Sequence, residues 1–197
     1  MKMKKLMLLV TLLTASTTFT VTAQNAVPSS RSQRKAQREA ERARLKAQEE
    51  ASETISYQEA VQALQNRRFV LEANQVMFRG GETAYVTSTT NFVLVNEQRG
   101  TVQVAFNTPY PGPNGIGGIT VDGQINALKT TTDKRGNLST QFNIQGIGIS
   151  AQIFITLPKG NNRATVTVSP NFNGNTLTLS GQLVPLNQSS IFKGRSW

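Results

Sequence analysis

Apolar residues alternate with polar or small ones along most of the chain after Arg68. The alternation has a period of two and recurs in six stretches, at residues 102–106, 119–125, 138–144, 149–157, 164–168 and 177–183. Thr, Gln, Asn and Ser occupy most of the intervening positions. This pattern is typical of antiparallel strands that bury one face and leave the other in water.

Turn signals separate these stretches and set the number of strands. Residues 80–81, 99–100, 133–137, 159–162 and 173–175 are rich in Gly, Asn and Asp, which tolerate the positive φ values of hairpin turns. Earlier candidate strands at 68–73, 85–88 and 91–96 bring the total to eight or nine. We predict a mainly β fold, an antiparallel meander of about eight strands forming a barrel-like sheet or a sandwich, with the barrel preferred.

Two segments before the strands have the pattern of helices. Residues 30–53 are strong helix formers, and Ala36, Ala40, Ala43 and Ala47 recur on one face. Arginines crowd the first half and glutamates the end, which opposes the helix dipole, so this leader is either a charged helix or a flexible tether. Residues 56–65 form a short amphipathic helix, and Ser56 followed by Glu59 predicts a capping box at its start.

The first residues have the pattern of a secretory signal peptide. Three lysines precede a short apolar run at residues 6–13, and small residues follow up to Ala23. The run is too short to span a bilayer, so we expect cleavage between Ala23 and Gln24 and no transmembrane anchor afterwards. The expected organisation is a signal peptide at 1–23, a charged leader at 24–54, and a β domain with an N-terminal helix at 55–197.

The composition narrows the chemistry that is available. The chain has no Cys and no His, which removes disulfides, thiolate nucleophiles and the commonest general base and metal ligand. Carboxylates are scarce after residue 66, and neither a nucleophile elbow nor a facing acid pair is apparent. We therefore expect no enzyme, with no catalytic, cofactor-binding or metal-binding residues and no cofactor.

The positive charge is scattered. The formal net charge is +10, but no basic run is interleaved with aromatic residues. This argues against nucleic acid as the partner, and leaves an anionic component of the cell envelope as one option.

One irregular segment is a candidate for an interaction. Residues 107–118 hold three prolines and four glycines and are the longest loop, and long loops often carry function. Tyr110, Asn114, Gly115, Gly117 and Gly118 are the candidate residues. A phosphate site is disfavoured because a strand follows the loop instead of a helix.

Four stretches carry a resemblance to a known family: RRFVLEAN at 67–74, TSTTNFVLV at 87–95, NGIGGITVDG at 114–123, and the strand around Gly181 with the segment 189–194. Together with the signal peptide and short helix, they resemble an uncharacterised exported family of Bacteroidetes, domain of unknown function 4251. The resemblance implies a periplasmic β domain, and it transfers no activity and no site residue.

These observations favour an exported, periplasmic, non-enzymatic binding or scaffold module. Its partner is a small apolar ligand or an anionic envelope component. A small outer-membrane β-barrel is the first alternative, although Trp and Tyr total only four, too few for two aromatic girdles. A carboxylate-dependent hydrolase is the second alternative. The sequence leaves open whether the sheet interior is packed or hollow, because both need inward apolar residues.

Overall fold

The computed structural model describes residues 30–106, 112–147, 150–171 and 176–195. The expected signal peptide with its cleavage site at Ala23 and Gln24, the loop residue Tyr110 and the turn at 173–175 lie outside these residues. The chain divides into two compact units, Met1–Arg42 and Ala43–Trp197. Of the first unit the structure describes the start of a helix, and the second unit holds all the strands.

One continuous helix, α1 (Ser30–Gln65), replaces the two predicted helical segments. The leader 30–53 is therefore helical, and the capping box predicted at Ser56 is wrong because Ser56 lies inside the helix. Residues 30–52 are all exposed, whereas Ala60, Ala63 and Leu64 are buried. Alanine and long straight side chains lose little conformational freedom in a helix, which explains why this charged segment joins the amphipathic one without a break.

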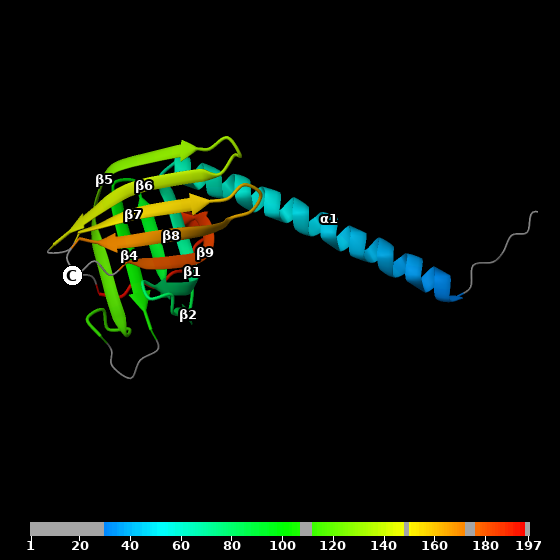
Figure 1. The fold of residues 1–197 in the computed structure, drawn as a ribbon, viewed down its shortest axis with the longest axis horizontal. Helices are drawn as coiled ribbons and strands as arrows, with labels where there is room; N and C mark the ends of the chain where they lie inside the picture. The colour runs from blue at the N-terminus through cyan, green and yellow to red at the C-terminus, as the bar shows by residue number, and fades with distance from the viewer. Residues whose placement is uncertain (1–29, 107–111, 148–149, 172–175, 196–197) are drawn as a thin grey trace, which may run out of the picture. The chain divides into compact units, whose positions relative to one another are not determined.

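Within the described residues, nine strands follow the helix and all pair antiparallel (Figure 1). They are β1 (Arg68–Phe78), β2 (Thr83–Tyr85), β3 (Phe92–Asn96), β4 (Arg99–Ala105), β5 (Gly118–Thr132), β6 (Leu138–Gly146), β7 (Ser150–Leu157), β8 (Arg163–Pro170) and β9 (Leu177–Pro185). The order β2-β1-β3-β4-β5-β6-β7-β8-β9, with β1 also paired to β9, makes a closed barrel of eight strands with β2 as one extra strand. The predicted barrel is confirmed, and the sandwich is not formed.

The closure of the barrel depends on a bulge in β1. The register of β1 with β9 shifts between Ala73 and Gln75, so the strand bends there. Before the bulge β1 pairs with β3, and after it β1 pairs with β2. The turn between β3 and β4 is at Glu97 and Gln98, where Glu97 has a φ of 56°. The turn predicted at residues 99–100 is therefore wrong, since both residues belong to β4.

The apolar positions of the strands face inward and fill the barrel. Phe69, Leu71, Phe142, Ile153 and Ile155 are among the inner residues with 0–1% of their surface exposed. Such values leave no void large enough for a water molecule against these side chains. The inner core is therefore packed over the described residues, as is common in eight-stranded barrels.

The last two turns of α1 close one end of this barrel. Ala60, Ala63 and Leu64 belong to the same core cluster as the inner strand residues, and Tyr57 and Val61 pack against it. The Tyr57 hydroxyl donates a hydrogen bond of 3.1 Å to the Gly136 carbonyl in the β5–β6 hairpin. We call this the helix end of the barrel.

Candidate functional site

Asn114, one of the predicted interaction-loop residues, is bonded to its own chain. Asn114 is buried, and its side chain donates to the Val104 carbonyl and the Thr120 hydroxyl, both at 3.4 Å. Its Oδ1 accepts from the backbone N–H groups of Ile116 at 3.1 Å and Gly118 at 2.9 Å. Asn114 therefore fixes its own loop against β4 and β5 and has no free polar atom for a ligand.

The glycines of this loop are there for backbone geometry. Gly115 and Gly117 have φ values of 78° and 84°, in the left-handed region that favours glycine. A Cβ on Gly118 would lie 1.8 Å from the Val104 carbonyl oxygen, so the β4–β5 pair requires glycine there. Gly115 is exposed, and a Cβ added to it would meet nothing within 4 Å. The described loop candidates thus do not combine into one site.

The chain end crosses the outside of the barrel next to this loop. We call residues 189–195 the C-terminal strap. Its backbone is held by the Phe192 N–H on the Thr89 carbonyl at 2.8 Å and the Arg195 N–H on the Asn114 carbonyl at 3.1 Å. Beneath the strap, the outward residues Val70 and Phe92 have no exposed surface, although they are not part of the inner core cluster. The outer face is therefore covered at these two positions of β1 and β3.

Gln103 on β4 binds the strap as a peptide group would. Its Nε2 donates to the Phe192 carbonyl at 2.7 Å and the Thr90 carbonyl at 2.9 Å. Its Oε1 accepts from the Gly194 N–H at 2.8 Å and the Thr120 hydroxyl at 2.9 Å. Both donors and both acceptor positions of this completely buried amide are thus used.

Charged groups hold the strap at its two ends. Glu72 Oε1 accepts from the Ser189 hydroxyl at 2.7 Å and the Ser190 N–H at 3.2 Å. Asp122 on β5 accepts from Lys193 Nζ at 2.6 Å and from an Arg99 guanidinium nitrogen at 3.2 Å. The two carboxylates that lie within strands therefore secure the chain end.

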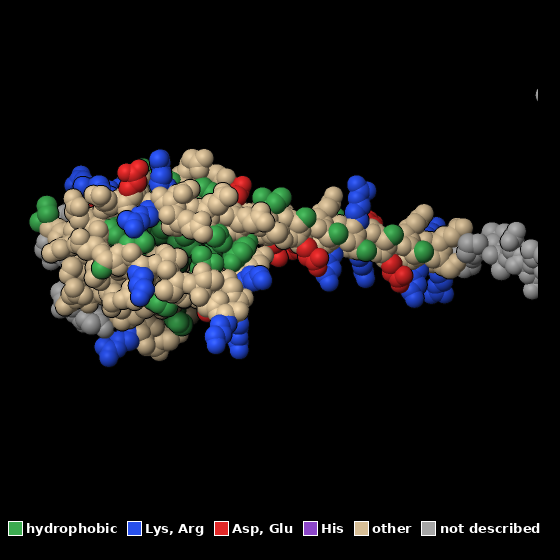
Figure 2. All heavy atoms as spheres, turned by 90° about the horizontal axis from the view of Figure 1, so that it is seen from above, with side chains coloured by type: hydrophobic (Ala, Val, Ile, Leu, Met, Phe, Trp, Pro, Cys, Tyr) green, Lys and Arg blue, Asp and Glu red, His purple; other side chains and the backbone are tan. Residues whose placement is uncertain are grey.

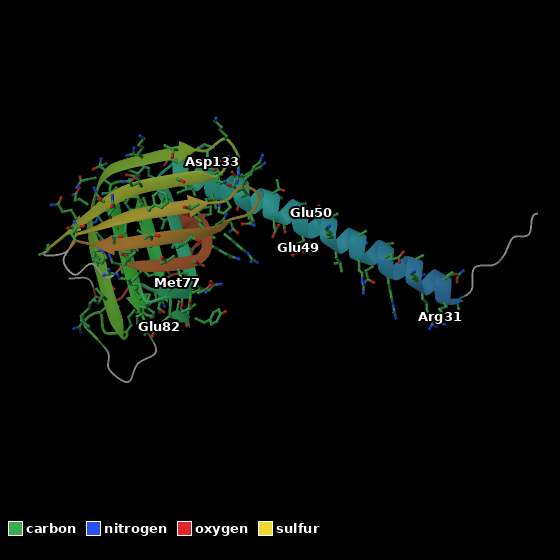
Figure 3. All side chains as sticks on the ribbon, viewed as in Figure 1. Arg31, Glu49, Glu50, Met77, Glu82 and Asp133 are labelled. Carbon is green, nitrogen blue, oxygen red and sulfur yellow. The ribbon has the colours of Figure 1, made fainter. Side chains whose placement is uncertain are left out.

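The surroundings of Asp122 shift its pKa. Burial alone would raise the pKa of the carboxyl, but the hydrogen bonds and charges of Lys193 and Arg99 outweigh burial and hold it below its ordinary 3.8. At Asp133, in the β5–β6 hairpin (Figure 3), a hydrogen bond from the Asn137 backbone N–H is the main reason that the pKa is lowered. Both carboxyls are thus held in the ionised form, which does not suit a general acid at neutral pH.

The lowered pKa of Asp122 predicts acid sensitivity. A carboxyl whose pKa is depressed by folding stabilises the fold above its ordinary value of 3.8 and loses that contribution as pH falls through the lower, folded value. We expect Asp122→Asn to lower the free energy of unfolding by about 1 kcal/mol at neutral pH, with the gap to wild type closing below pH 3.8. Thermal unfolding across pH measures this, with the exposed Glu82→Gln variant as control. A gap that stays constant down to pH 3 would contradict the assignment.

The barrel end opposite α1 has a different character. Phe78, Val86, Phe106 and Leu177, which pack partly buried against the core, lie at this end, where β1, β4, β5 and β9 begin or finish. Ile119 on β5 shares the inner face through its register with Val104. These five residues are less buried than the inner core, and Ile119 is 47% exposed although it is in register with the buried Val104. The rings of Phe78 and Phe106 lie 5.5 Å apart. We call these five residues the rim cluster.

Exposed apolar side chains extend this cluster outward. Met77, labelled in Figure 3, and Tyr85 lie on the outer face of β1 and β2, and both are exposed. Met77 is in register with Thr83, so Tyr85 is its diagonal neighbour across the strand pair. The sequence could not single out the rim cluster, because its residues follow the same alternation as the inner core.

A polar recess lies at the helix end. It has a volume of about 420 Å³ and is lined by Glu59, Gln62, Asn66, Arg68, Asn187 and Gln188, among others. The Gln188 side chain donates to Glu59 at 3.4 Å. The amides and charges that line this recess do not suit an apolar ligand. Of the two ends, the rim cluster alone has the chemistry for one.

The described residues offer no further chemical group. They contain no cluster of three or more His, Cys, Asp or Glu that could hold a metal ion. Across the same residues, no helix is both long and apolar enough to cross a membrane.

The fold and its two ends define a small closed antiparallel barrel with an α-helix against one end. A family model described as a domain of unknown function (DUF4251) matches residues 50–183, and the chain belongs to this family. The crystal structure of a DUF4251 family protein from Bacteroides eggerthii is 71% identical, covers 75% of this chain and 99% of that chain, and has a TM-score of 0.64. The comparison with curated proteins found no match. The resemblance seen in the sequence is thus confirmed.

Proposed function

We propose that this chain is an exported, non-enzymatic binding module of the periplasm, and that its rim cluster contacts a small apolar ligand or the apolar part of a larger one. The observation that supports this most is the partial exposure of inward-facing side chains at one end of an otherwise packed barrel. Burying an aliphatic side chain against a ligand contributes about 1.5–3 kcal/mol, so these residues gain free energy from an apolar partner.

The packed core sets the depth of the proposed site. Because residues such as Phe142 and Ile153 have almost no exposed surface, a ligand does not enter the middle of the barrel. It binds at the end, against Phe78, Phe106 and Ile119. This arrangement differs from barrels that enclose a ligand in a hollow centre.

The outward faces of the strands support an aqueous surrounding. Gln141, Asn143 and Gln145 on β6 and Thr165 on β8 face outward and are exposed. A barrel embedded in an outer membrane needs an apolar outward band instead. The leader pattern at residues 1–23 supports export, and the lowered pKa of Asp122, which binds the strap, supports a role without catalysis.

The rim cluster is tested with an apolar fluorescent probe, N-phenyl-1-naphthylamine, added to protein purified from periplasmic extract without refolding. We expect saturable binding, weakened about tenfold or more in the Ile119→Asn variant because the amide removes apolar surface at the rim. Native mass spectrometry of the same preparation would detect a ligand that is retained through purification.

Phe154→Asn is the matched control. The exposed fraction of Phe154 is 43%, similar to the 47% of Ile119, but Phe154 lies on the outer face of β7. Equal loss of probe binding in the two variants would reject the rim as the site. Recovery of the protein only in detergent would reject the soluble periplasmic part of the proposal.

A further inference from the structure

The long helix α1 separates its charges along its length. Residues 30–46 hold seven basic and two acidic side chains, and residues 47–65 hold four acidic and no basic ones. Figure 2 shows these charged side chains along the helix, and Figure 3 labels Arg31 near its start and Glu49 and Glu50 further on. Almost all of them are exposed.

This order of charges is unfavourable for a helix on its own. A helix carries partial positive charge at its N-terminus and partial negative charge at its C-terminus, so basic residues first and acidic residues last oppose the dipole. The first turn holds no acidic residue and the last turn no basic one. Lys35 forms an ion pair with Glu39 at 3.9 Å, and Lys46 forms one with Glu50 at 3.8 Å. Both have the less favourable direction, with lysine before glutamate.

An antiparallel partner of the same sequence reverses both costs. The basic stretch of one copy then lies beside the acidic stretch of the other. The two helix dipoles are also antiparallel, so that they attract each other. About a centre at Ala47, Lys35 of one copy lies opposite Glu59 of the other and Arg44 lies opposite Glu50, whereas Glu41 lies opposite Glu53.

We propose that α1 is a self-association surface that pairs antiparallel with α1 of a second copy, and that charge complementarity drives the pairing. A parallel pair is disfavoured because it places like charges together along the whole helix. The pairing is independent of the rim cluster, so the two proposals stand or fall separately.

Single cysteines test the geometry directly, since the chain has no native cysteine to interfere. In the full chain from Gln24, Ala47→Cys at the centre is expected to form a disulfide-linked dimer under mild oxidation. Ala36→Cys, near one end of the helix, is expected not to form one. Asn143→Cys on the outer face of β6 measures random collision. Linkage of Ala47→Cys no greater than that of Asn143→Cys, or equal linkage of Ala36→Cys, overturns the proposal.

Charge exchange tests the driving force. We expect the dimer, measured by light scattering after gel filtration, to weaken about tenfold or more between about 0.05 M and about 0.5 M salt. A variant with Arg38, Arg42 and Arg44 changed to Glu, and another with Glu49, Glu50 and Glu53 changed to Lys, are each expected to be monomeric. Mixed together, they are expected to form a heterodimer, which also shows that both have folded.

Two results count against this interface. Dimers of either charge variant alone would mean that charge does not drive the pairing. A chain that is monomeric at low salt and instead sediments with vesicles of anionic lipid would assign the basic stretch to a membrane surface.

Discussion

Replacing Gly181 with alanine is expected to lower the free energy of unfolding by at least about 3 kcal/mol, or to prevent folding. A Cβ at this position would lie 1.9 Å from the Glu72 carbonyl oxygen and 2.7 Å from the Ala73 Cα. Both contacts are to backbone atoms of β1, so no side chain can move aside. The pairing of β1 with β9 must open to admit the methyl group.

The position of this glycine makes the effect large. Gly181 pairs with Ala73 at the point where β1 bulges, and the β1–β9 pair is the one that closes the barrel. Thermal unfolding should show a loss of roughly 10 °C or more if the variant folds. Gly80→Ala is the control, because a Cβ on Gly80 meets nothing within 4 Å and the residue has no positive φ. If Gly181→Ala has the same unfolding temperature as Gly80→Ala, the β1–β9 pair can accept a side chain at the bulge and the prediction is wrong.

The inner half of this fold could be predicted from the sequence. The alternation of Leu138, Thr140, Phe142 and Ile144 is the burial pattern of β6, because a period of two leaves only one face to bury. On β5 and β9, Gly123 and Gly181 stand at inward positions where the alternation would place an apolar side chain. The structure explains both, since a Cβ on either glycine would meet a backbone carbonyl of the neighbouring strand.

The burial of outward-facing residues beneath the C-terminal strap could not be predicted in the same way. Gln103 and Thr120 occupy positions between inward apolar residues, which in most strands means contact with water. What buries them is the C-terminal strap, a segment without periodicity whose backbone supplies the hydrogen bonds. No local sequence pattern predicts that residues 189–195 return to β4, because the hydrogen bonds join the side-chain amide of Gln103 to backbone groups far along the chain.

The internal role of Asn114 could not be predicted for a related reason. Proline and glycine at residues 107–118 correctly predict irregular structure, but composition does not distinguish a loop that binds a ligand from one that binds its own chain. Asn114 is of the second kind, since its carbonyl accepts from the strap and its side chain from its own loop. An asparagine directly before a glycine is a weak sign of such internal capping.

Replacing Gln103 with leucine is expected to cost about 3–5 kcal/mol and to release the C-terminal strap. The two side chains are similar in size, but leucine leaves the Phe192 and Thr90 carbonyls and the Gly194 N–H without their partner. Each buried group left unpaired costs about 1–3 kcal/mol. The strap keeps its contacts through Thr89, Asn114 and Asp122, so its release should be local and should precede global unfolding.

Limited trypsin digestion followed by mass spectrometry measures this release at the peptide bond after Lys193, and thermal unfolding measures the stability of the barrel. Gln141→Leu is the matched control, because Gln141 has an exposed side chain on the outer face of β6. We expect this variant to change the free energy of unfolding by no more than about 0.5 kcal/mol and to leave the cleavage rate at Lys193 as in wild type. Faster cleavage at Lys193 in Gln103→Leu, with the rest of the barrel still resistant, is the expected result, since the amide links two peptide groups of the strap to β4. If cleavage at Lys193 stays as slow as in wild type, the remaining contacts hold the strap and Gln103 only fills space beneath it.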